Sequence, residues 1–201
     1  MRRHRPDTGG RERRGPSSRE IRPGHQGIGR RSPAAAEQVS DDLRLGSGDL
    51  LQQRRRVAAL GLGAATAYAV VALYQFGLVK HLPEPPLPGV DADRVDASGE
   101  AYALLHTPDA ALGLASVGAT LALTGAGSRR RHRERPWLVF AATGKVAADA
   151  AMALWLTAEQ LTKHRRICSW CTLAAACHLA AVPPAAAEAR AALSAARRHR
   201  P

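Results

Sequence analysis

Long apolar blocks alternate with charged segments along this chain. Residues 57–79 and 110–128 contain no Asp, Glu, Lys or Arg. Two further blocks have a similar length but carry polar interruptions. A helix of about 20 apolar residues is long enough to cross the hydrocarbon core of a bilayer. The pattern therefore predicts an all-α polytopic membrane protein, a bundle of four transmembrane helices with spans near residues 57–79, 109–127, 137–158 and 167–187.

A soluble helical bundle is the alternative, because the blocks are rich in alanine, which is nearly neutral on membrane-insertion scales. A helix at the surface of a soluble bundle carries charged residues along its outer face. Residues 57–79 provide no such face. The pattern therefore favours a bundle that spans the membrane.

The distribution of charge tests this prediction independently. The net charge of +12 is on its own typical of a nucleic-acid-binding protein. Residues 1–56 hold fourteen arginines against seven acidic residues, whereas residues 80–107 hold two basic residues against five acidic ones. Residues 128–136 and the C-terminal end are again basic, and only the short link around Lys163 departs from the alternation. Because cytoplasmic segments are enriched in Lys and Arg, both termini are expected in the cytoplasm.

These observations predict a multi-pass protein of the inner or plasma membrane, with membrane lipid as a partner and no nucleic acid. Residues 1–50 are dominated by Arg, Gly, Pro and Ser, which predicts a disordered arginine-rich cytoplasmic tail. Residues 57–187 form the predicted membrane domain, and residues 188–201 form a basic cytoplasmic tail. The stretch RRRVAALGLGAATA is similar to a twin-arginine signal, but its apolar run continues well past signal length. We therefore expect a retained first helix.

Residues 80–108 are the one long segment expected outside the cytoplasm. The PEPPLPG part is predicted to be extended, because proline has no N–H donor and disfavours helix in the residue before it. The VDASGEAYALL part predicts a short helix with Ser98 as its N-cap. This loop is either a lid over the mouth of the bundle or a plain connector.

The stretch RRICSWCTLAAACHL places a Cys-x-x-Cys pair, Cys168 and Cys171, at the beginning of the fourth predicted helix. A thiol at a helix N-terminus lies near free backbone N–H groups and the positive end of the helix dipole, which favour the thiolate. Cys168 is therefore expected to be the thiolate member, and Cys171 to be better shielded by apolar neighbours. A position outside the cytoplasm, where disulfides persist, favours a redox pair over two packed cysteines.

Zinc is the main chemical competitor for these cysteines. His164, Cys168, Cys171 and His178 share one helical stripe. However, His178 lies seven residues beyond Cys171, roughly 10 Å along a helix, which is too far for the same ion. A second Cys-x-x-Cys is absent from the sequence, and Thr172 stands where haem attachment requires histidine. We therefore expect no metal.

Other polar residues lie inside the apolar blocks. Lys145 and Asp149 are four residues apart, so they can pair on one helix face, either as a structural ion pair or as groups that exchange protons beside a cofactor. They are the candidate cofactor-binding residues. Cys177 is expected to be a small packed residue, and His178 either a buried hydrogen-bonded residue or part of a proton path.

With its Cys-x-x-Cys at the outer end of the last of four helices, in ICSWCTLAAA, the chain resembles the vitamin K epoxide reductase family, including its bacterial quinone-linked homologues. The segment TPDAALGLASVGATLAL is similar to the second helix of that family. The resemblance covers roughly residues 57–187.

The resemblance implies that Cys168 and Cys171 are the catalytic pair and exchange electrons with a quinone of the menaquinone or ubiquinone type. It also implies a thioredoxin-like thiol partner outside the cytoplasm, and a role in disulfide formation there. Two features depart from the family pattern: residues 80–108 contain no cysteine pair, and Ala175 stands where the family has an aromatic residue. A non-catalytic membrane bundle with structural cysteines, which binds a partner or quinone, is the alternative.

Overall fold

The computed structural model describes residues 34–198. The chain divides into two compact units, residues 1–37 and 38–201, and the first contributes only the beginning of one helix to the described residues. The helices are α1 (Ala34–Leu45), α2 (Asp49–Gln75), α3 (Ala92–Asp96), a 3-10 helix (Gly99–Tyr102), α4 (Asp109–Gly125), α5 (Arg131–Glu134), α6 (Pro136–Glu159) with a π-helical turn (Gln160–His164), and α7 (Ser169–Arg198).

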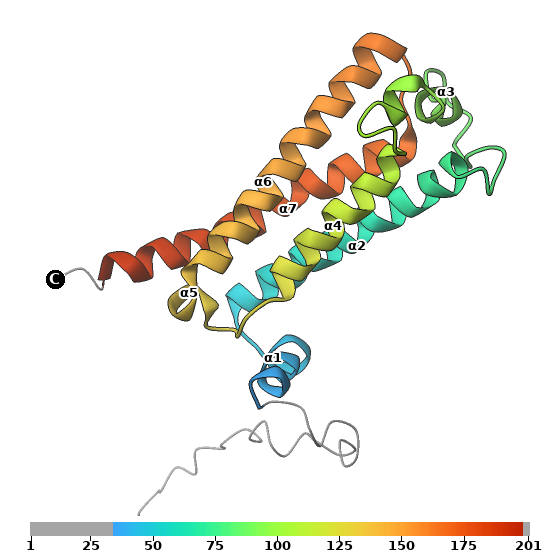
Figure 1. The fold of residues 1–201 in the computed structure, drawn as a ribbon. Helices are drawn as coiled ribbons and strands as arrows, with labels where there is room; N and C mark the ends of the chain where they lie inside the picture. The colour runs from blue at the N-terminus through green and yellow to red at the C-terminus, as the bar shows by residue number, and fades with distance from the viewer. Residues whose placement is uncertain (1–33, 199–201) are drawn as a thin grey trace, which may run out of the picture. The chain divides into compact units, whose positions relative to one another are not determined.

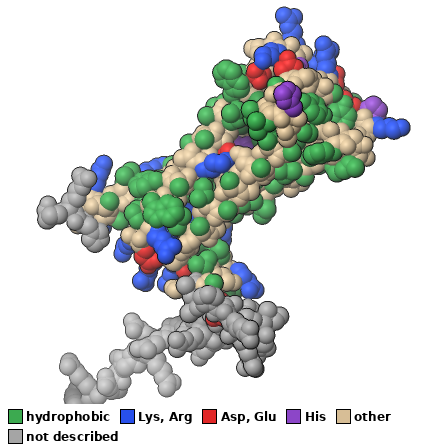
Figure 2. Space-filling view, in the orientation of Figure 1, with side chains coloured by type: hydrophobic (Ala, Val, Ile, Leu, Met, Phe, Trp, Pro, Cys, Tyr) green, Lys and Arg blue, Asp and Glu red, His purple; other side chains and the backbone are tan. Residues whose placement is uncertain are grey.

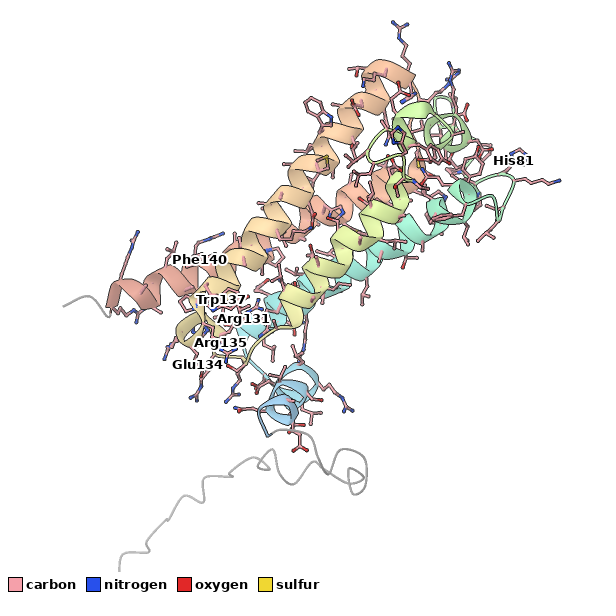
Figure 3. All side chains as sticks on the ribbon, viewed as in Figure 1. His81, Arg131, Glu134, Arg135, Trp137 and Phe140 are labelled. Carbon is pink, nitrogen blue, oxygen red and sulfur yellow. The ribbon has the colours of Figure 1, made fainter. Side chains whose placement is uncertain are left out.

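The helices α2, α4, α6 and α7 lie side by side in a bundle (Figure 1). Helix α7 packs along both α2 and α6, and α4 packs against α2. Contact between α4 and α6 is much sparser, which leaves room for a cavity on that side. The loop that contains α3 lies at one end of the bundle and α5 at the other (Figure 1). Figure 3 labels His81 at the loop end and Arg131 at the α5 end.

Three helices are long and apolar enough to cross a membrane: α2, α6 with its π-helical turn, and α7. Helix α4 is also apolar but has only 17 residues. Hydrophobic side chains are spread along the flank of the bundle in the face shown, and most of the charged side chains lie toward its ends (Figure 2). The described residues therefore confirm a helical architecture with three helices of membrane-spanning length, whereas the fourth span remains a prediction.

The helix bounds differ from the apolar blocks in three places. Helix α2 begins at Asp49, because the strong helix formers that precede the apolar block continue its helical turns. Residues 34–45 are helical, in contrast to the expected disordered tail over residues 1–50, and residues 1–33 lie outside the described part of the chain. Helix α7 continues to Arg198, so most of the predicted C-terminal tail is helical.

Small side chains bring the helices close together in the middle of the bundle. Ala64, Ala67 and Ala174 are almost fully buried in one cluster, and Cys177 packs against it as expected. Close packing of small residues is a common way for helices to associate in membranes. Gly113 of α4 is a further example, because a Cβ atom there would lie 2.8 Å from the ring of Tyr68.

Candidate active site

Helix α7 begins at the Cys-x-x-Cys pair. Cys168 directly precedes the helix, and its carbonyl oxygen accepts a hydrogen bond from the Thr172 N–H at 3.0 Å. The Cys168 sulfur accepts a second hydrogen bond from the Cys171 N–H at 3.1 Å. Cys168 thus occupies the N-cap position, where a side-chain acceptor meets a backbone donor of the first turn. The predicted place of the first thiol, beside free N–H groups at a helix start, is confirmed.

The exposure of the two cysteines is the reverse of the sequence-based expectation. Cys168 is fully buried, with an exposed fraction of 0 %, whereas Cys171 is only partly buried and faces a cavity. The expectation that Cys171 is the better shielded thiol is therefore wrong. The reason is the loop between α2 and α4, which packs Leu82, Ala92 and Val95 into the same apolar cluster as Cys168.

Glu84 of this loop is hydrogen-bonded to the beginning of α7. Its Oε1 atom accepts hydrogen bonds from the backbone N–H and the hydroxyl of Ser169, both at 2.7 Å. Its Oε2 atom accepts from the Ala92 N–H at the start of α3. A carboxylate at a helix N-terminus is favourable because it faces unpaired N–H groups and the positive end of the dipole. Glu84 therefore joins the starts of two helices.

A short parallel bridge fixes the loop against the residue that precedes Cys168. The Ile167 N–H donates to the Gly89 carbonyl at 2.9 Å, and the Asp91 N–H donates to the Ile167 carbonyl at 3.0 Å. Trp170 adds a bond from its indole nitrogen to the Pro83 carbonyl at 2.9 Å. The loop therefore covers the start of α7 and is more than a connector.

The side of Cys168 that faces α6 is held by Gln160. This residue lies in the π-helical turn, and its Oε1 atom accepts a hydrogen bond from the Cys168 N–H at 3.1 Å. Single π-helical turns of this kind are frequent at functional sites. The chain then turns through Arg165, which has a left-handed conformation with φ 51°, and enters α7.

A buried carboxylate, Asp96 at the end of α3, lies against the dithiol. Its exposed fraction is 1 %, and its Oδ1 atom accepts a hydrogen bond from the Cys171 thiol at 3.4 Å. The donor atoms of Asp96, Cys168 and Cys171 all lie within 4.8 Å of one another. Burial raises the pKa of Asp96 to about 6, because it penalises the charged form. This contact could not be predicted from the sequence, because it depends on how the loop folds back.

These three side chains present donor atoms that a metal ion accepts. A closed structural zinc site uses four side-chain ligands, whereas the described residues bring three together here. We interpret the group as a dithiol with a neighbouring carboxylate, since the two sulfurs lie within 4.8 Å of each other and the Cys171 thiol donates to Asp96.

A cavity of about 380 Å³ opens beside Cys171. Residues of α2, α4, α6, α7 and the loop line it, and most of its wall is apolar. A few polar side chains converge on it, as is typical of small-molecule sites. They include Tyr68, Asp96, Ser116, Asp149 and His178. Ala175 also lines the cavity, so the absent aromatic residue leaves space there.

The predicted pair of Lys145 and Asp149 forms on α6 and lies in a larger network. Ser116 and Thr120 of α4 donate to Asp149 at 2.8 and 2.6 Å. Lys145 in turn donates to the Ser116 hydroxyl at 2.7 Å. Asp149 reaches the cavity wall, whereas Lys145 is not among the lining residues. The four-residue spacing of Ser116 and Thr120 on one helix face was the available sequence signal for this network.

Two further predictions concern polar side chains near the cavity. His178 is buried, and its Nε2 atom lies 3.2 Å from the Tyr68 hydroxyl, as expected for a buried hydrogen-bonded histidine. Ser98 does precede a short helix, but its hydroxyl makes no capping bond. The preceding helix, α3, does have a side-chain cap, because Asp91 accepts a hydrogen bond from the Arg94 N–H at 3.0 Å.

The fold and site together define a class: an all-helical bundle of the membrane-protein type with two cysteines at the start of its last helix, beside a cavity. The model of the vitamin K epoxide reductase family matches residues 56–185, which is more than half of the sequence, and the chain belongs to this family. No curated protein and no solved structure shows significant similarity to this chain. Family membership agrees with a membrane thiol oxidoreductase.

Proposed function

We propose that this protein is a membrane thiol–disulfide oxidoreductase in which Cys168 and Cys171 pass electrons to a quinone. The observation that carries the proposal is the position of Cys171. Its sulfur lies within 4.8 Å of the Cys168 sulfur, and Cys171 is one of the residues that line the cavity. A disulfide can therefore form and break at the wall of a site that holds a small molecule.

The cavity suits a quinone ring. Its volume of about 380 Å³ lies in the range of small-molecule sites, and its wall is mainly apolar. The Tyr68 hydroxyl lies on that wall beside His178, and a hydroxyl can donate the kind of hydrogen bond that a carbonyl oxygen accepts. When bound, a quinone of the menaquinone or ubiquinone type supplies an acceptor for two electrons and two protons. Lys145 lies outside the cavity wall and holds Asp149 in place.

The dithiol returns to its reduced form by exchange with a thiol partner. The sequence has three cysteines and none of them lies in residues 80–108, so the partner reacts with the Cys168–Cys171 disulfide directly. Attack is expected at the Cys171 sulfur, since Cys168 is fully buried. Cys168 is then the leaving thiolate, and the Cys171 N–H bond and the helix N-terminus stabilise its charge.

We further propose that the dithiol end faces away from the cytoplasm and that both termini lie in it, so that the protein supports disulfide formation outside the cytoplasm. The basic segment 128–136 lies at the end of the bundle opposite the loop that carries five acidic residues (Figure 1). Basic segments are enriched on the cytoplasmic side. A thioredoxin-like protein is the expected electron donor.

Thiol trapping tests the redox pair. Purified reduced protein in detergent is incubated with or without a short-chain quinone, and free thiols are then labelled and counted by mass. The quinone is expected to remove two of the three labels of the wild type, and to remove none in Cys168→Ser. A Cys177→Ser variant serves as the matched control and is expected to lose both of its labels. Unchanged labelling of the wild type would support a non-catalytic bundle and contradict the proposal.

A further inference from the structure

We propose that Asp96 is the proton acceptor for the Cys171 thiol when the dithiol is oxidised, and the proton donor to Cys171 when the disulfide is reduced. This inference rests on the proposed function and assigns a catalytic residue to it. The residue comes from the loop that, in this chain, has no cysteines.

The geometry places Asp96 for proton transfer. Its Oδ1 atom lies 3.4 Å from the Cys171 sulfur, within the range of a hydrogen bond to sulfur. Its Oδ2 atom is buried without a hydrogen-bond partner among residues 34–198. A buried carboxylate oxygen without a partner is costly, and such groups are rare unless they serve a purpose.

Neighbouring acidic residues of the same segment show what a structural role looks like. Asp91 accepts the Arg94 N–H and caps α3. Asp93 accepts the Leu82 N–H at 2.8 Å and contacts His81. The Asp96 carboxylate, by contrast, has hydrogen bonds only with the two thiols in the described part of the chain. Its position is therefore not explained by backbone support.

The electrostatic surroundings suit a group that exchanges protons. Burial raises the pKa of Asp96 to about 6; the charges of Asp109 and Glu84 act in the same direction, whereas hydrogen bonds from the thiols act against it. A proton acceptor works best when its pKa lies near the working pH. The titratable groups that face Asp96 or share its cavity wall come from every element around it. They are Tyr68 and Tyr74 of α2, Glu84 and Glu100 of the loop, Asp109 of α4, Asp149 and Glu159 of α6, His164 of the π-helical turn, Cys168, and Cys171 and His178 of α7.

The S–H bond of Cys171 breaks and its proton moves to Asp96 Oδ1, the Cys168 thiol also loses its proton, and an S–S bond forms between Cys171 and Cys168. The two electrons released, together with both thiol protons, end on the quinone, which leaves as the quinol. Asp96 passes its proton on and returns to the carboxylate. Reduction of the disulfide by a partner dithiol runs the proton transfer in reverse.

The test compares wild type with Asp96→Asn and uses a small aromatic disulfide as the oxidant, so that no quinone is needed. The oxidation rate is measured between pH 4.5 and 8.5. The wild-type rate is expected to rise through a midpoint near pH 6 and then to level off, following ionisation of Asp96. Asp96→Asn is expected to lose this midpoint and to be roughly a hundredfold slower at pH 7, the lower end of the effect of a general base. Its rate should continue to rise into the alkaline range, as that of an ordinary thiol does.

Asp93→Asn is the matched control, because it removes a carboxylate that holds the same loop but does not contact the dithiol. It is expected to keep the midpoint near pH 6. The proposal is overturned if Asp96→Asn keeps that midpoint, if Asp93→Asn loses it too, or if Asp96→Asn reacts faster than the wild type at pH 7. The last result would mean that the carboxylate only opposes thiolate formation.

An infrared difference spectrum of the wild type gives a second readout that needs no variant to fold. Oxidation of the dithiol should change the signal of a protonated buried carboxyl group, and an unchanged signal would contradict the proposal. The inference and the proposed function fail separately. Loss of quinone-dependent oxidation with an intact pH midpoint removes the quinone acceptor and leaves the role of Asp96.

Discussion

The two ends of the bundle each bury a carboxylate, and they treat it in opposite ways. At the α5 end, Glu188 accepts two hydrogen bonds from the Arg131 guanidinium, at 2.8 and 2.6 Å. Both side chains are almost fully buried. At the loop end, Asp96 is equally buried but has no cationic partner within hydrogen-bond distance among the described residues, and one of its oxygens is unpaired.

The buried side chains at the α5 end have many partners because they also bind the C-terminus of a helix. Arg131 donates to the Leu123 and Ala126 carbonyls, and Arg54 donates to those of Thr124 and Ala126, so two arginines bind the free carbonyls at the C-terminus of α4. Cations at a helix C-terminus also complement its dipole. Buried charges that are fully paired are typical of a structural role, whereas an unpaired one beside a cavity marks a candidate functional site.

The largest expected effect comes from removing the carboxylate that pairs with Arg131 at the α5 end. Glu188→Ala leaves the Arg131 guanidinium buried without a counter-charge, which is expected to cost about 3–5 kcal/mol of unfolding free energy. Thermal unfolding in detergent measures it. The matched control is Glu159→Ala, which breaks the exposed pair with Lys163 and should cost less than about 1 kcal/mol. Equal losses in the two variants would contradict this account of the α5 end.

Removal of the unpaired carboxylate of Asp96 is expected to raise the free energy of unfolding, whereas removal of Glu188 lowers it. The pKa of Asp96 is about 6 in the folded protein against an ordinary value of 3.8, so the native state binds more protons between these pH values. The contribution of Asp96 to the free energy of unfolding is therefore fully present below pH 3.8 and is lost as the pH rises through 6. At pH 7.5, Asp96→Asn is expected to be more stable than wild type by up to about 3 kcal/mol. The difference in unfolding temperature should shrink toward pH 4, and a destabilised variant at pH 7.5 would refute the comparison.

A third substitution asks whether the shape of the guanidinium matters at the α5 end. Arg54 is 3 % exposed and donates to the carbonyls of Thr124, Ala126, Gly127 and Ser128. Arg54→Lys keeps the charge, but a lysine ammonium cannot bind all four carbonyl oxygens. The substitution is expected to lower the free energy of unfolding by about 2 kcal/mol. The corresponding change at the exposed Arg56, Arg56→Lys, should have no measurable effect in the same unfolding assay.

The smallest expected effect lies between the two ends. Ser116→Ala removes one of the hydroxyls that bind Asp149, while Thr120 and Lys145 remain in contact with that carboxylate. The expected cost is about 1 kcal/mol, the usual value of one hydrogen bond. A loss as large as that of Glu188→Ala would show that the middle network is as strongly coupled as the α5 end.

The sequence predicted those features that depend on nearby residues. Apolar blocks indicated the helices, and a four-residue spacing indicated the pair of Lys145 and Asp149, which the structure confirms. The Cys-x-x-Cys at a helix start was likewise visible, together with the N–H groups beside its first thiol. In each case the periodicity of a single helix determines the geometry.

Features that depend on the folded loop could not be predicted in this way. Glu84 reaches Ser169 across 85 positions of the chain, and Asp96 reaches Cys171 across 75. No helical or strand period links such residues. The burial of Cys168 and the carboxylate beside the dithiol therefore could not be predicted from the sequence. The buried Arg131 escaped notice for the same reason, because in the sequence it is one of several arginines in a basic segment.

The central claim is that Cys168 and Cys171 are oxidised to a disulfide while a quinone is reduced to the quinol. Its most direct test is to titrate the reduced protein with a short-chain quinone, to measure the quinol by absorbance, and to map the disulfide by mass spectrometry of the digested protein. We predict one quinol for each disulfide, and that the disulfide joins Cys168 to Cys171. Quinone left unreduced by the dithiol, or a disulfide that includes Cys177, would contradict the account.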